Sequence, residues 1–229
     1  MKQPKLKGDS LMCKHAVVDL EMCKVPFEAR KEEYRYGNET IQIGAVLLNE
    51  SLEIEDEFET YVMPQFGHID FYIKKLTGIC PSNVNNAPDM KEALHKFIEW
   101  LPEDVKIVSW GNSDKLQIQR ETESKHISIS GLDDLLDGWI DCQEIFGEKV
   151  HTKRRYKLSN ALIAADINYE DGAHDGLIDA KNTALLFAKM KKTPELALNP
   201  CYKSAISEEY SESIGFTLGS LFPSTLDIK

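Results

Sequence analysis

The chain has 229 residues, a length that suits one well-buried domain. Its content of 42% hydrophobic and 28% charged residues is ordinary for a globular protein and argues against disorder. A net charge of −11 disfavours a basic protein that coats nucleic acid, but it is compatible with an enzyme that holds phosphate through metal ions. No apolar run approaches the roughly 18–20 residues that cross a bilayer, so no membrane partner is expected.

The N-terminal sequence and the cysteines both bear on location. Residues 1–13 contain lysines but no apolar stretch, and they are expected to form an N-terminal leader rather than a secretory signal. The five cysteines are widely spread and form no C-x-x-C pair: Cys13, Cys23, Cys80, Cys142 and Cys201. This usage is typical of free thiols in a reducing compartment, so the expected location is the cytoplasm.

The predicted elements begin with three short strands in a meander, over residues 15–21, 41–48 and 58–62. The next element is a helix over 87–101, because its apolar residues recur on one stripe before Pro102 ends it. Strands and helices then alternate through a strand at 106–110, a helix at 113–123, a short strand at 139–142 and helices at 158–165 and 176–190.

A meander followed by this alternation predicts an α/β fold. We expect a mixed central sheet flanked by helices, with the first strand in its middle. The domain is expected to span 14–192, with a long loop at 24–38. Ser159 is expected to be the N-cap of the helix predicted at 158–165. Residues 193–229 are rich in proline and are expected to form an irregular C-terminal extension.

Two acids occupy one face of the first predicted strand. Side chains alternate along a strand, so Val17, Asp19 and Glu21 share a face. Carboxylates this close repel each other, and burial costs them their hydration unless they are paired or bound to a metal ion. Two interpretations are open from this motif alone: the acids project from the strand end into water, or they bind a cation.

The last predicted helix carries a third acid in an unexpected place. Asp179 stands at the head of a mostly apolar helical stripe, where leucine or alanine would be ordinary. His174 precedes it by five residues, about 140° away around a helix, so it does not share that face. We therefore expect His174 on the glycine-flanked loop before the helix, from which it can reach the same place.

Asp114 is the fourth acid, and it follows the strand predicted at 106–110. Parallel α/β sheets place their sites at the carboxyl ends of strands, where Asp19 and Glu21 also lie. Four carboxylates and one imidazole, without a thiolate, suit Mg²⁺ or Mn²⁺ better than zinc.

Three motifs carry a resemblance to a known family: VVDLEMC with Asp19 and Glu21, SWGNSDKLQIQRE with Asp114, and AHDGLIDAKNTA with His174 and Asp179. In this order they resemble the DEDDh 3′–5′ exonucleases of the RNase H-like fold. The resemblance extends to the branch that holds histone-mRNA 3′-exonucleases and the bacterial inhibitor of the KinA sporulation pathway. IQIGAVLLN, FETYVMPQF, LTGI and LSNAL also match, so the resemblance covers roughly residues 14–190.

This resemblance implies hydrolysis of a phosphodiester with two Mg²⁺ or Mn²⁺ ions. Asp19 would bridge both ions, Glu21 and Asp179 would complete the shell of the first, and Asp114 would orient the second. His174 would be the general base for the attacking water, since imidazoles titrate near neutral pH. The expected partner is the 3′ end of single-stranded RNA or DNA, with RNA favoured by analogy with the branch, and the products are nucleoside 5′-monophosphates.

Five further residues are candidates to contact the substrate. By resemblance, Met22, Leu76 and Thr77 would touch the terminal nucleotides, with core packing as the alternative for each. Arg154 and Arg155 belong to the densest cluster of positive charge, which could meet upstream phosphates or be a solvated loop without a role.

Two functions of other classes remain as alternatives. One is a nucleic-acid-binding module on the same fold without catalysis, and the other is a regulatory protein with a vestigial or secondary nuclease site. No feature of the sequence indicates an oligomeric state.

Overall fold

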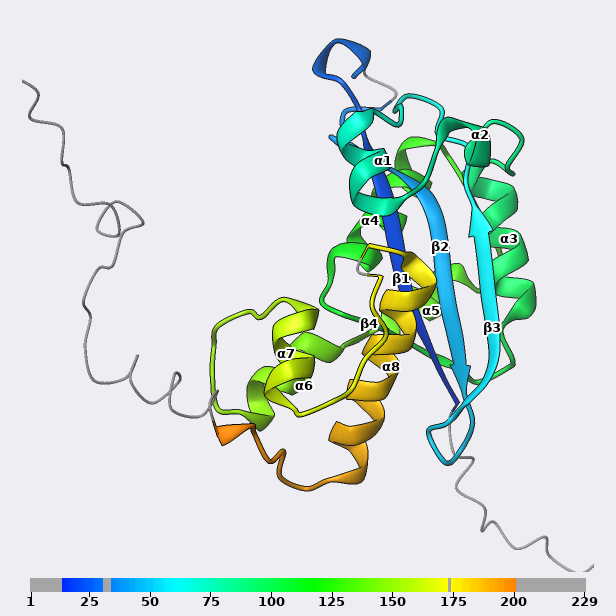
Figure 1. Ribbon diagram of the computed structural model, residues 1–229. Coiled ribbons are helices and arrows are strands. Elements are labelled where there is room, and N and C mark those ends of the chain that lie inside the picture. The colour runs from blue at the N-terminus through cyan, green and yellow to red at the C-terminus, as the bar shows by residue number, and fades with distance from the viewer. Residues whose placement is uncertain (1–13, 31–33, 173, 201–229) are drawn as a thin grey trace, which may run out of the picture.

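A five-stranded sheet with the order β3-β2-β1-β4-β5 forms the centre of the molecule (Figure 1). The computed structural model describes residues 14–30, 34–172 and 174–200. The strands are β1 (His15–Lys24), β2 (Asn38–Leu48), β3 (Ile54–Tyr61), β4 (Lys106–Ser109) and β5 (Ile140–Asp141). β1, β2 and β3 pair antiparallel, whereas β4 is parallel to β1 and β5 is parallel to β4. The expected mixed sheet with the first strand in its middle is confirmed.

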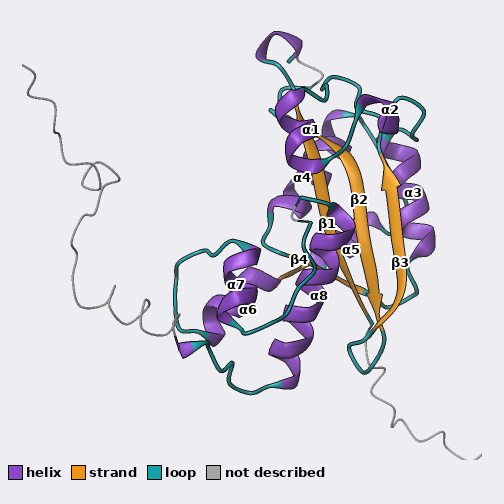
Figure 2. Cartoon of the chain, viewed as in Figure 1, coloured by secondary structure: helices purple, strands orange, loops and turns teal. Residues whose placement is uncertain are grey.

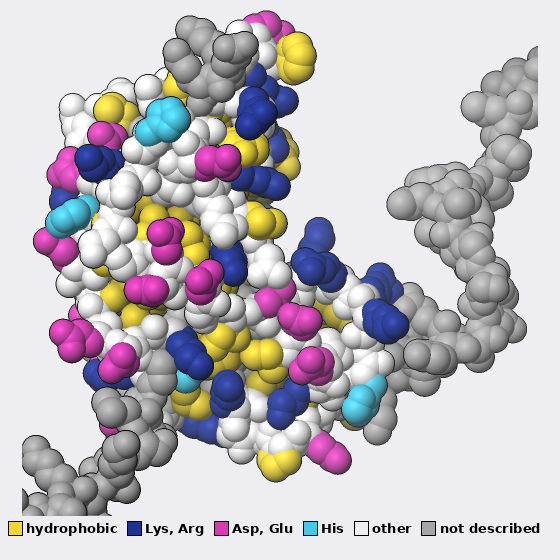
Figure 3. Space-filling model, turned by 180° about the vertical axis from the view of Figure 1, so that it is seen from behind, with side chains coloured by type: hydrophobic (Ala, Val, Ile, Leu, Met, Phe, Trp, Pro, Cys, Tyr) yellow, Lys and Arg dark blue, Asp and Glu magenta, His cyan; other side chains and the backbone are white. Residues whose placement is uncertain are grey.

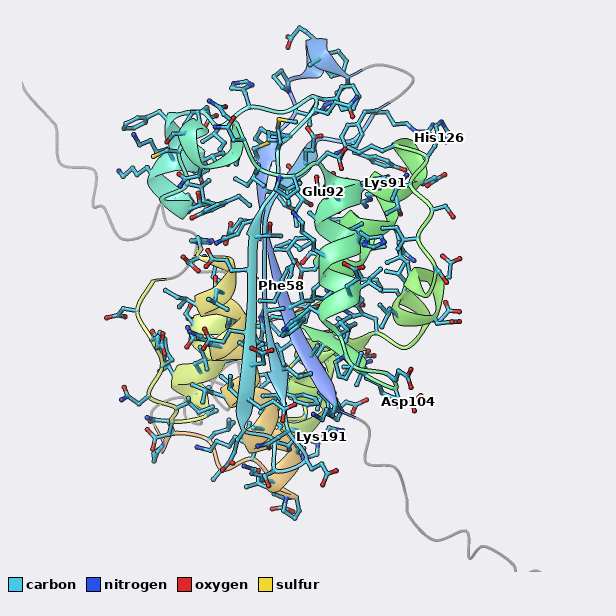
Figure 4. All side chains as sticks on the ribbon, turned by 90° about the vertical axis from the view of Figure 1, so that its right-hand side faces the viewer. Phe58, Lys91, Glu92, Asp104, His126 and Lys191 are labelled. Atoms are coloured by element: carbon cyan, nitrogen blue, oxygen red, sulfur yellow. The ribbon has the colours of Figure 1, made fainter. Side chains whose placement is uncertain are left out.

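Helices cover both faces of this sheet (Figure 2). They are η1 (Phe27–Ala29), α1 (Phe71–Thr77), α2 (Pro81–Val84), α3 (Met90–Trp100), α4 (Ser113–Ser124), α5 (Leu132–Asp137), α6 (Cys142–Lys149), α7 (Leu158–Ala164) and α8 (Gly176–Lys192). The edge-on view of Figure 4 shows α3, α4 and α5 on one side of the sheet and α8 on the other. Within the described ranges, no helix is both long and apolar enough to span a membrane.

Alternate residues of β1 face these two layers. Ala16 and Val18 are buried in the cluster that includes α3, whereas Val17 is buried in the cluster that includes α8. Asp19 and Glu21 continue the face of Val17 toward α8, as expected from the alternation. The interpretation that these acids simply project into water is therefore wrong, because Glu21 is only 7% exposed.

α8 begins directly over the middle of the sheet. The antiparallel register places Gly44 of β2 beside Asp19, and Gly176 starts the helix above this pair. A Cβ on Gly176 would lie 3.2 Å from the backbone oxygen of Asp19. The absence of side chains at these two glycines lets the helix approach the strands closely enough for its first turn to reach the acids of β1.

A buried ion cluster fixes the loop that leads into α1. Glu39 is fully buried and accepts hydrogen bonds from the backbone N–H groups of Gln65, Phe66 and Gly67, at 2.7–2.8 Å. Lys125 at the end of α4 pairs with Glu39 at 2.7 Å. Burial by itself lowers the pKa of Lys125, but the acidic partners outweigh it and raise the pKa overall. This cluster ties α1, and with it the LTGI segment, to the sheet.

Several local predictions differ from the structure. The helices α1, α2, α5 and α6 were not predicted, because each has eight residues or fewer and its apolar residues repeat over too few turns to form a recognisable stripe. The expected N-cap Ser159 is wrong: the chain is extended at Lys157 and helical from Leu158, so Ser159 lies inside the first turn. The third strand begins at Ile54, earlier than predicted. Its first residues are mostly acidic and exposed at the edge of the sheet, so they show no apolar alternation.

The first residues after α8 pack on the domain. Leu196 is buried against the cluster that includes α8, and the N–H of Asn199 donates to the carbonyl oxygen of Ala164 at 2.8 Å. The rest of the predicted extension, from residue 201, lies outside the described residues, as do the predicted leader, Cys13 and Cys201. Cys23, Cys80 and Cys142 are free thiols, as expected.

Candidate active site

The four predicted acids and the predicted histidine come together from four segments. Asp19 and Glu21 lie on β1, Asp114 is in the first turn of α4, Asp179 is in the first turn of α8, and His174 precedes that helix. Ligand atoms of Glu21, His174 and Asp179 lie within 4.8 Å of one another. Asp19 is close enough to Asp114, Asp179 and Glu21 for all three to act on its ionisation. One cluster therefore contains all five.

Asp114 reaches the cluster because β4 is short. Pairing between β1 and β4 ends at Val17 and Val108, and the chain then turns into α4. The N–H of Leu20 on β1 donates to the carboxylate of Asp114 beyond the end of this pairing. Asp114 is 4% exposed, and the hydroxyl of Ser113 lies 3.5 Å from its Oδ2. The hydrogen bond to Leu20 holds the start of α4 beside the acids of β1.

The first turn of α8 is held by its own acids. Asp175 is the N-cap, and its Oδ1 accepts hydrogen bonds from the N–H groups of Leu177 and Ile178 at 3.0 and 3.1 Å. The N–H of His174 donates to Oδ2 of Asp179 at 2.9 Å. His174 has a φ of 71°, a left-handed conformation that is uncommon outside glycine. This turn keeps the exposed imidazole near the carboxylates, on the loop where we expected it.

Burial and mutual repulsion oppose ionisation of these acids. Burial raises the pKa of Asp19 well above its usual range, and Asp114, Asp179 and Glu21 raise it further. Burial, then Asp179 and Asp114, raise the pKa of Glu21 to about 8. Burial also raises the pKa of Asp114 to about 7, although backbone N–H groups counteract part of the rise, and it raises that of Asp179. His174 counteracts part of the rise at Asp179, whereas the causes that act on Asp19 and Glu21 all raise their pKa values.

A divalent cation fits this donor set. The donors are carboxylate oxygens and one imidazole nitrogen, and the set has no thiolate. Mg²⁺ and Mn²⁺ prefer oxygen ligands, and a bound cation would favour the ionised form of every carboxylate that repulsion now disfavours. Glu21 and Asp179 are placed to share one cation, with Asp19 and Asp114 beside them.

Comparison with known proteins identifies the family. Residues 16–187 match the model of the Exonuclease family. The chain belongs to this exonuclease family.

Two curated relatives illustrate the similarity. ERI1 exoribonuclease 2 of Danio rerio is 29% identical over 206 residues, which are 79% of this chain and 36% of the relative. 3′-5′ exoribonuclease 1 of Mus musculus is 31% identical over 186 residues, which are 74% of this chain and 52% of the relative. The chain thus spans about half of these relatives' length or less.

Solved structures of DEDDh exonucleases share the fold. The nuclease domain of 3′hExo, a DEDDh family member bound to rAMP, is 25% identical with a TM-score of 0.68, over 84% of this chain and 98% of that chain. A 3′-exonuclease solved for its 3′-end specific recognition of histone mRNA stem-loop is 23% identical with a TM-score of 0.65, over 83% of this chain and 86% of that chain. The predicted RNase H-like fold and the resemblance to DEDDh exonucleases are thus confirmed.

The three predicted contacts to terminal nucleotides lie in different settings. Met22 is half-buried and packs against the cluster beneath α3, so core packing accounts for part of its side chain. Leu76 and Thr77 end α1 and are also half-buried. The Thr77 hydroxyl donates to the carbonyl oxygen of Ile73 at 2.9 Å and accepts from the N–H of Ile79 at 3.1 Å. Their contact with a nucleotide stays a prediction.

The predicted basic contacts line a cavity of about 840 Å³ beside α6. Arg154 and Arg155 are exposed, and the cavity also reaches Asn112, two residues before Asp114. The carbonyl oxygen of Tyr156, next to Arg155, accepts hydrogen bonds from the side chains of Trp110 and Gln143, at 3.0 and 2.7 Å. Figure 3 shows Lys and Arg side chains gathered on this projecting part of the molecule. The loop is therefore held on the α4 side of the acids.

Asp175 is a site residue that the sequence analysis missed. It contributes to the raised pKa values of Asp19, Glu21 and Asp179, after burial and the nearer acids. A signal for it was available, because an aspartate directly before a predicted helix start is a common N-cap.

Proposed function

We propose that this protein is a metal-dependent 3′–5′ exonuclease that shortens single-stranded nucleic acid, RNA in preference to DNA, to nucleoside 5′-monophosphates. The observation that carries the proposal is the convergence of four buried or half-buried carboxylates with one exposed histidine, in a chain of the exonuclease family. All five residues that the DEDDh resemblance requires are present and close together, which favours catalysis over a silent binding module.

The residues divide the chemistry between them. Asp19 would hold both of two Mg²⁺ or Mn²⁺ ions, Glu21 and Asp179 the first, and Asp114 the second. When bound, the ions supply activation of water and stabilisation of the leaving 3′-oxygen. His174 would take the proton of the attacking water at an imidazole nitrogen. Its exposure supports this role, because the water and the proton must exchange with solvent.

The preference for RNA is drawn from the relatives. The two relatives described above are exoribonucleases, and the two structures described above carry rAMP or concern the 3′ end of a histone mRNA stem-loop. The free thiols of Cys23, Cys80 and Cys142 support a reducing compartment, so we propose the cytoplasm as the location.

Substrate contacts are proposed on two sides of the acids. Leu76 and Thr77, with Met22, would touch the terminal nucleotides. Leu76 is half-buried and belongs to none of the three apolar clusters of the described core, which favours contact with a ligand over packing. Arg154 and Arg155 would meet phosphates further upstream, because they line the cavity beside α6, whose lining includes none of the four acids or His174.

Digestion of a single-stranded RNA labelled at its 5′ end tests this function. With Mg²⁺ or Mn²⁺ we expect a ladder of 5′-labelled products that shorten with time, together with unlabelled nucleoside 5′-monophosphates. The DNA oligonucleotide of the same sequence should be degraded more slowly, and a chelator should stop both reactions. Intact RNA in the presence of folded protein and metal would favour the regulatory alternative, and internal cleavage would contradict an exonuclease.

A further inference from the structure

Gln42 lies between the acids of β1 and the first turn of α8, and the proposed chemistry does not use it. It is on β2, opposite Glu21 in the antiparallel register, and it is 1% exposed. We propose that Gln42 is a positioning residue that anchors the start of α8 to the sheet, and so sets how closely Asp179 approaches the acids of β1. The proposal rests on the proposed function, because it concerns the same metal-binding carboxylates.

Two hydrogen bonds fix the Gln42 amide. The buried N–H of Gly176, 134 positions away in the chain, donates to Oε1 of Gln42 at 3.0 Å. Nε2 of Gln42 donates to Oε1 of Glu59 on β3 at 2.9 Å. A backbone N–H only donates and a carboxylate only accepts, so the amide has one orientation that satisfies both partners. Leucine at this position would satisfy neither.

The hydrogen bonds that Asp175 makes to the first turn do not provide this anchor. Asp175 accepts from the N–H groups of Leu177 and Ile178, but it directly precedes α8 and moves with it. Gln42 instead reaches the helix from a strand of the central sheet. Because Asp179 lies three residues after Gly176, any displacement of the helix start carries the Asp179 carboxylate with it.

A small displacement matters at a metal site. Mg²⁺ demands near-ideal octahedral geometry with ligand distances of about 2.0–2.1 Å, so its affinity depends on where each carboxylate is held. Residues that orient ligands without touching the metal typically change metal affinity or activity by about 10–100-fold when substituted. Gln42 is placed for such a role, because it bonds the α8 backbone on one side and lies opposite Glu21 on the other.

Titration of the protein with Mn²⁺ in the absence of nucleic acid tests the proposal. We expect Gln42→Leu to weaken Mn²⁺ binding by about 10–100-fold. Gln42→Asn is a milder variant whose shorter side chain cannot reach both partners, and it should weaken binding in the same direction. A melting curve in chelator establishes that each variant is folded before the titration.

Thr40→Val is the matched control. Thr40 is also buried on β2, and its hydroxyl donates to Glu121 on α4, away from α8. Thr40→Val therefore removes a buried hydrogen bond of the same strand without touching α8, and should lower the melting temperature while leaving Mn²⁺ affinity within about twofold of wild type. If Gln42 had a merely structural role, Gln42→Leu and Thr40→Val would have the same Mn²⁺ affinity.

The paired variant Gln42→Glu/Glu59→Gln provides a rescue. A carboxylate at position 42 still accepts from Gly176, and an amide at position 59 donates to it, so both hydrogen bonds are kept with unchanged net charge. Mn²⁺ affinity no weaker than wild type is expected. Wild-type affinity in Gln42→Leu, or a loss in the paired variant as large as in Gln42→Leu, would overturn the proposal. Wild-type protein that binds Mn²⁺ but leaves RNA intact would instead contradict the proposed nuclease activity.

Discussion

Gly44 of β2 and Gly176 of α8 touch so closely that Gly44 has no room for a side chain. A Cβ on Gly44 would lie 2.2 Å from the carbonyl carbon of Gly176, a distance at which the backbone itself must move. Gly44 is also the register partner of Asp19. The distance between β1 and the first turn of α8, and therefore between Asp19 and Asp179, depends on this contact.

We therefore predict that Gly44→Ala removes most of the nuclease activity and destabilises the protein by about 1–3 kcal/mol, because the added methyl group pushes α8 away from the sheet. Activity on labelled RNA and urea unfolding measure the two effects. Gly138→Ala is the control, since a Cβ there meets no atom closer than 3.5 Å. A Gly44→Ala protein with wild-type activity would mean that the site tolerates a shift of the helix.

The acids should also make stability depend on pH when metal is absent. The folded-state pKa values of Glu21, about 8, and Asp114, about 7, lie above the unfolded values of about 4.3 and 3.9. The folded protein then binds more protons than the unfolded chain between about pH 4 and 8. The free energy of unfolding should fall as pH rises through this window, by up to about 1.4 kcal/mol per pH unit for each extra proton held.

Urea unfolding in chelator at pH 5 and pH 8 measures this dependence. The Glu21→Gln/Asp114→Asn variant is the control for all other titrating groups, and its stability should fall less between the two pH values. Saturating Mg²⁺ should remove most of the fall in the wild type. Equal pH dependence in wild type and variant would contradict the raised pKa values.

His174 should act on the rate and not on metal binding. We predict that His174→Asn lowers kcat by about 10²–10⁴-fold, because the attacking water loses its general base. Asparagine is chosen because it tolerates the positive φ at this position. Mn²⁺ titration should give nearly wild-type affinity, and an equal loss of affinity would make His174 a metal ligand instead.

The basic loop should matter only for longer substrates. Arg154→Ala/Arg155→Ala is predicted to raise KM for a long oligonucleotide and to reduce the slope of log affinity against log salt by about 0.7 for each phosphate that the protein no longer neutralises. Cleavage of a dinucleotide should hardly change. Lys91→Ala/Lys96→Ala on α3 removes the same charge on the side of the sheet away from α8, and it should change the cleavage of neither substrate. Equal effects of the arginine variant on both substrates would mean that the loop supports the active site itself.

The cluster of acids at the candidate site could be predicted from the sequence because these acids interrupt apolar patterns. Asp19 and Glu21 break the apolar alternation of β1, and Asp179 stands on the apolar stripe of α8. Asp114 was found from its place after a strand, where α/β sheets carry their sites. The central position of β1 also followed from the pattern of elements, because a meander followed by alternating helices and strands favours a mixed sheet around the first strand.

Features that depend on distant contacts could not be predicted. Gln42 looks like an ordinary polar residue of a strand, and its burial arises from a helix 134 positions later in the chain. The ion pair between Glu39 and Lys125 likewise joins residues whose local sequence gives no sign of burial. Helix α6 was not predicted because its N-cap, Asp141, falls within the strand predicted at 139–142.

Release of nucleoside 5′-monophosphate from single-stranded RNA by the wild type, Asp19→Asn and Asp137→Asn, with Mn²⁺ present, tests the central claim most directly. The account predicts release by the wild type and by Asp137→Asn, whose substitution lies on an exposed position of α5, and no release by Asp19→Asn. Asp19→Asn should also be at least as stable as the wild type in chelator, because it removes a charge that its neighbours repel. Undiminished release by a folded Asp19→Asn protein would contradict the assignment of this cluster as the catalytic site.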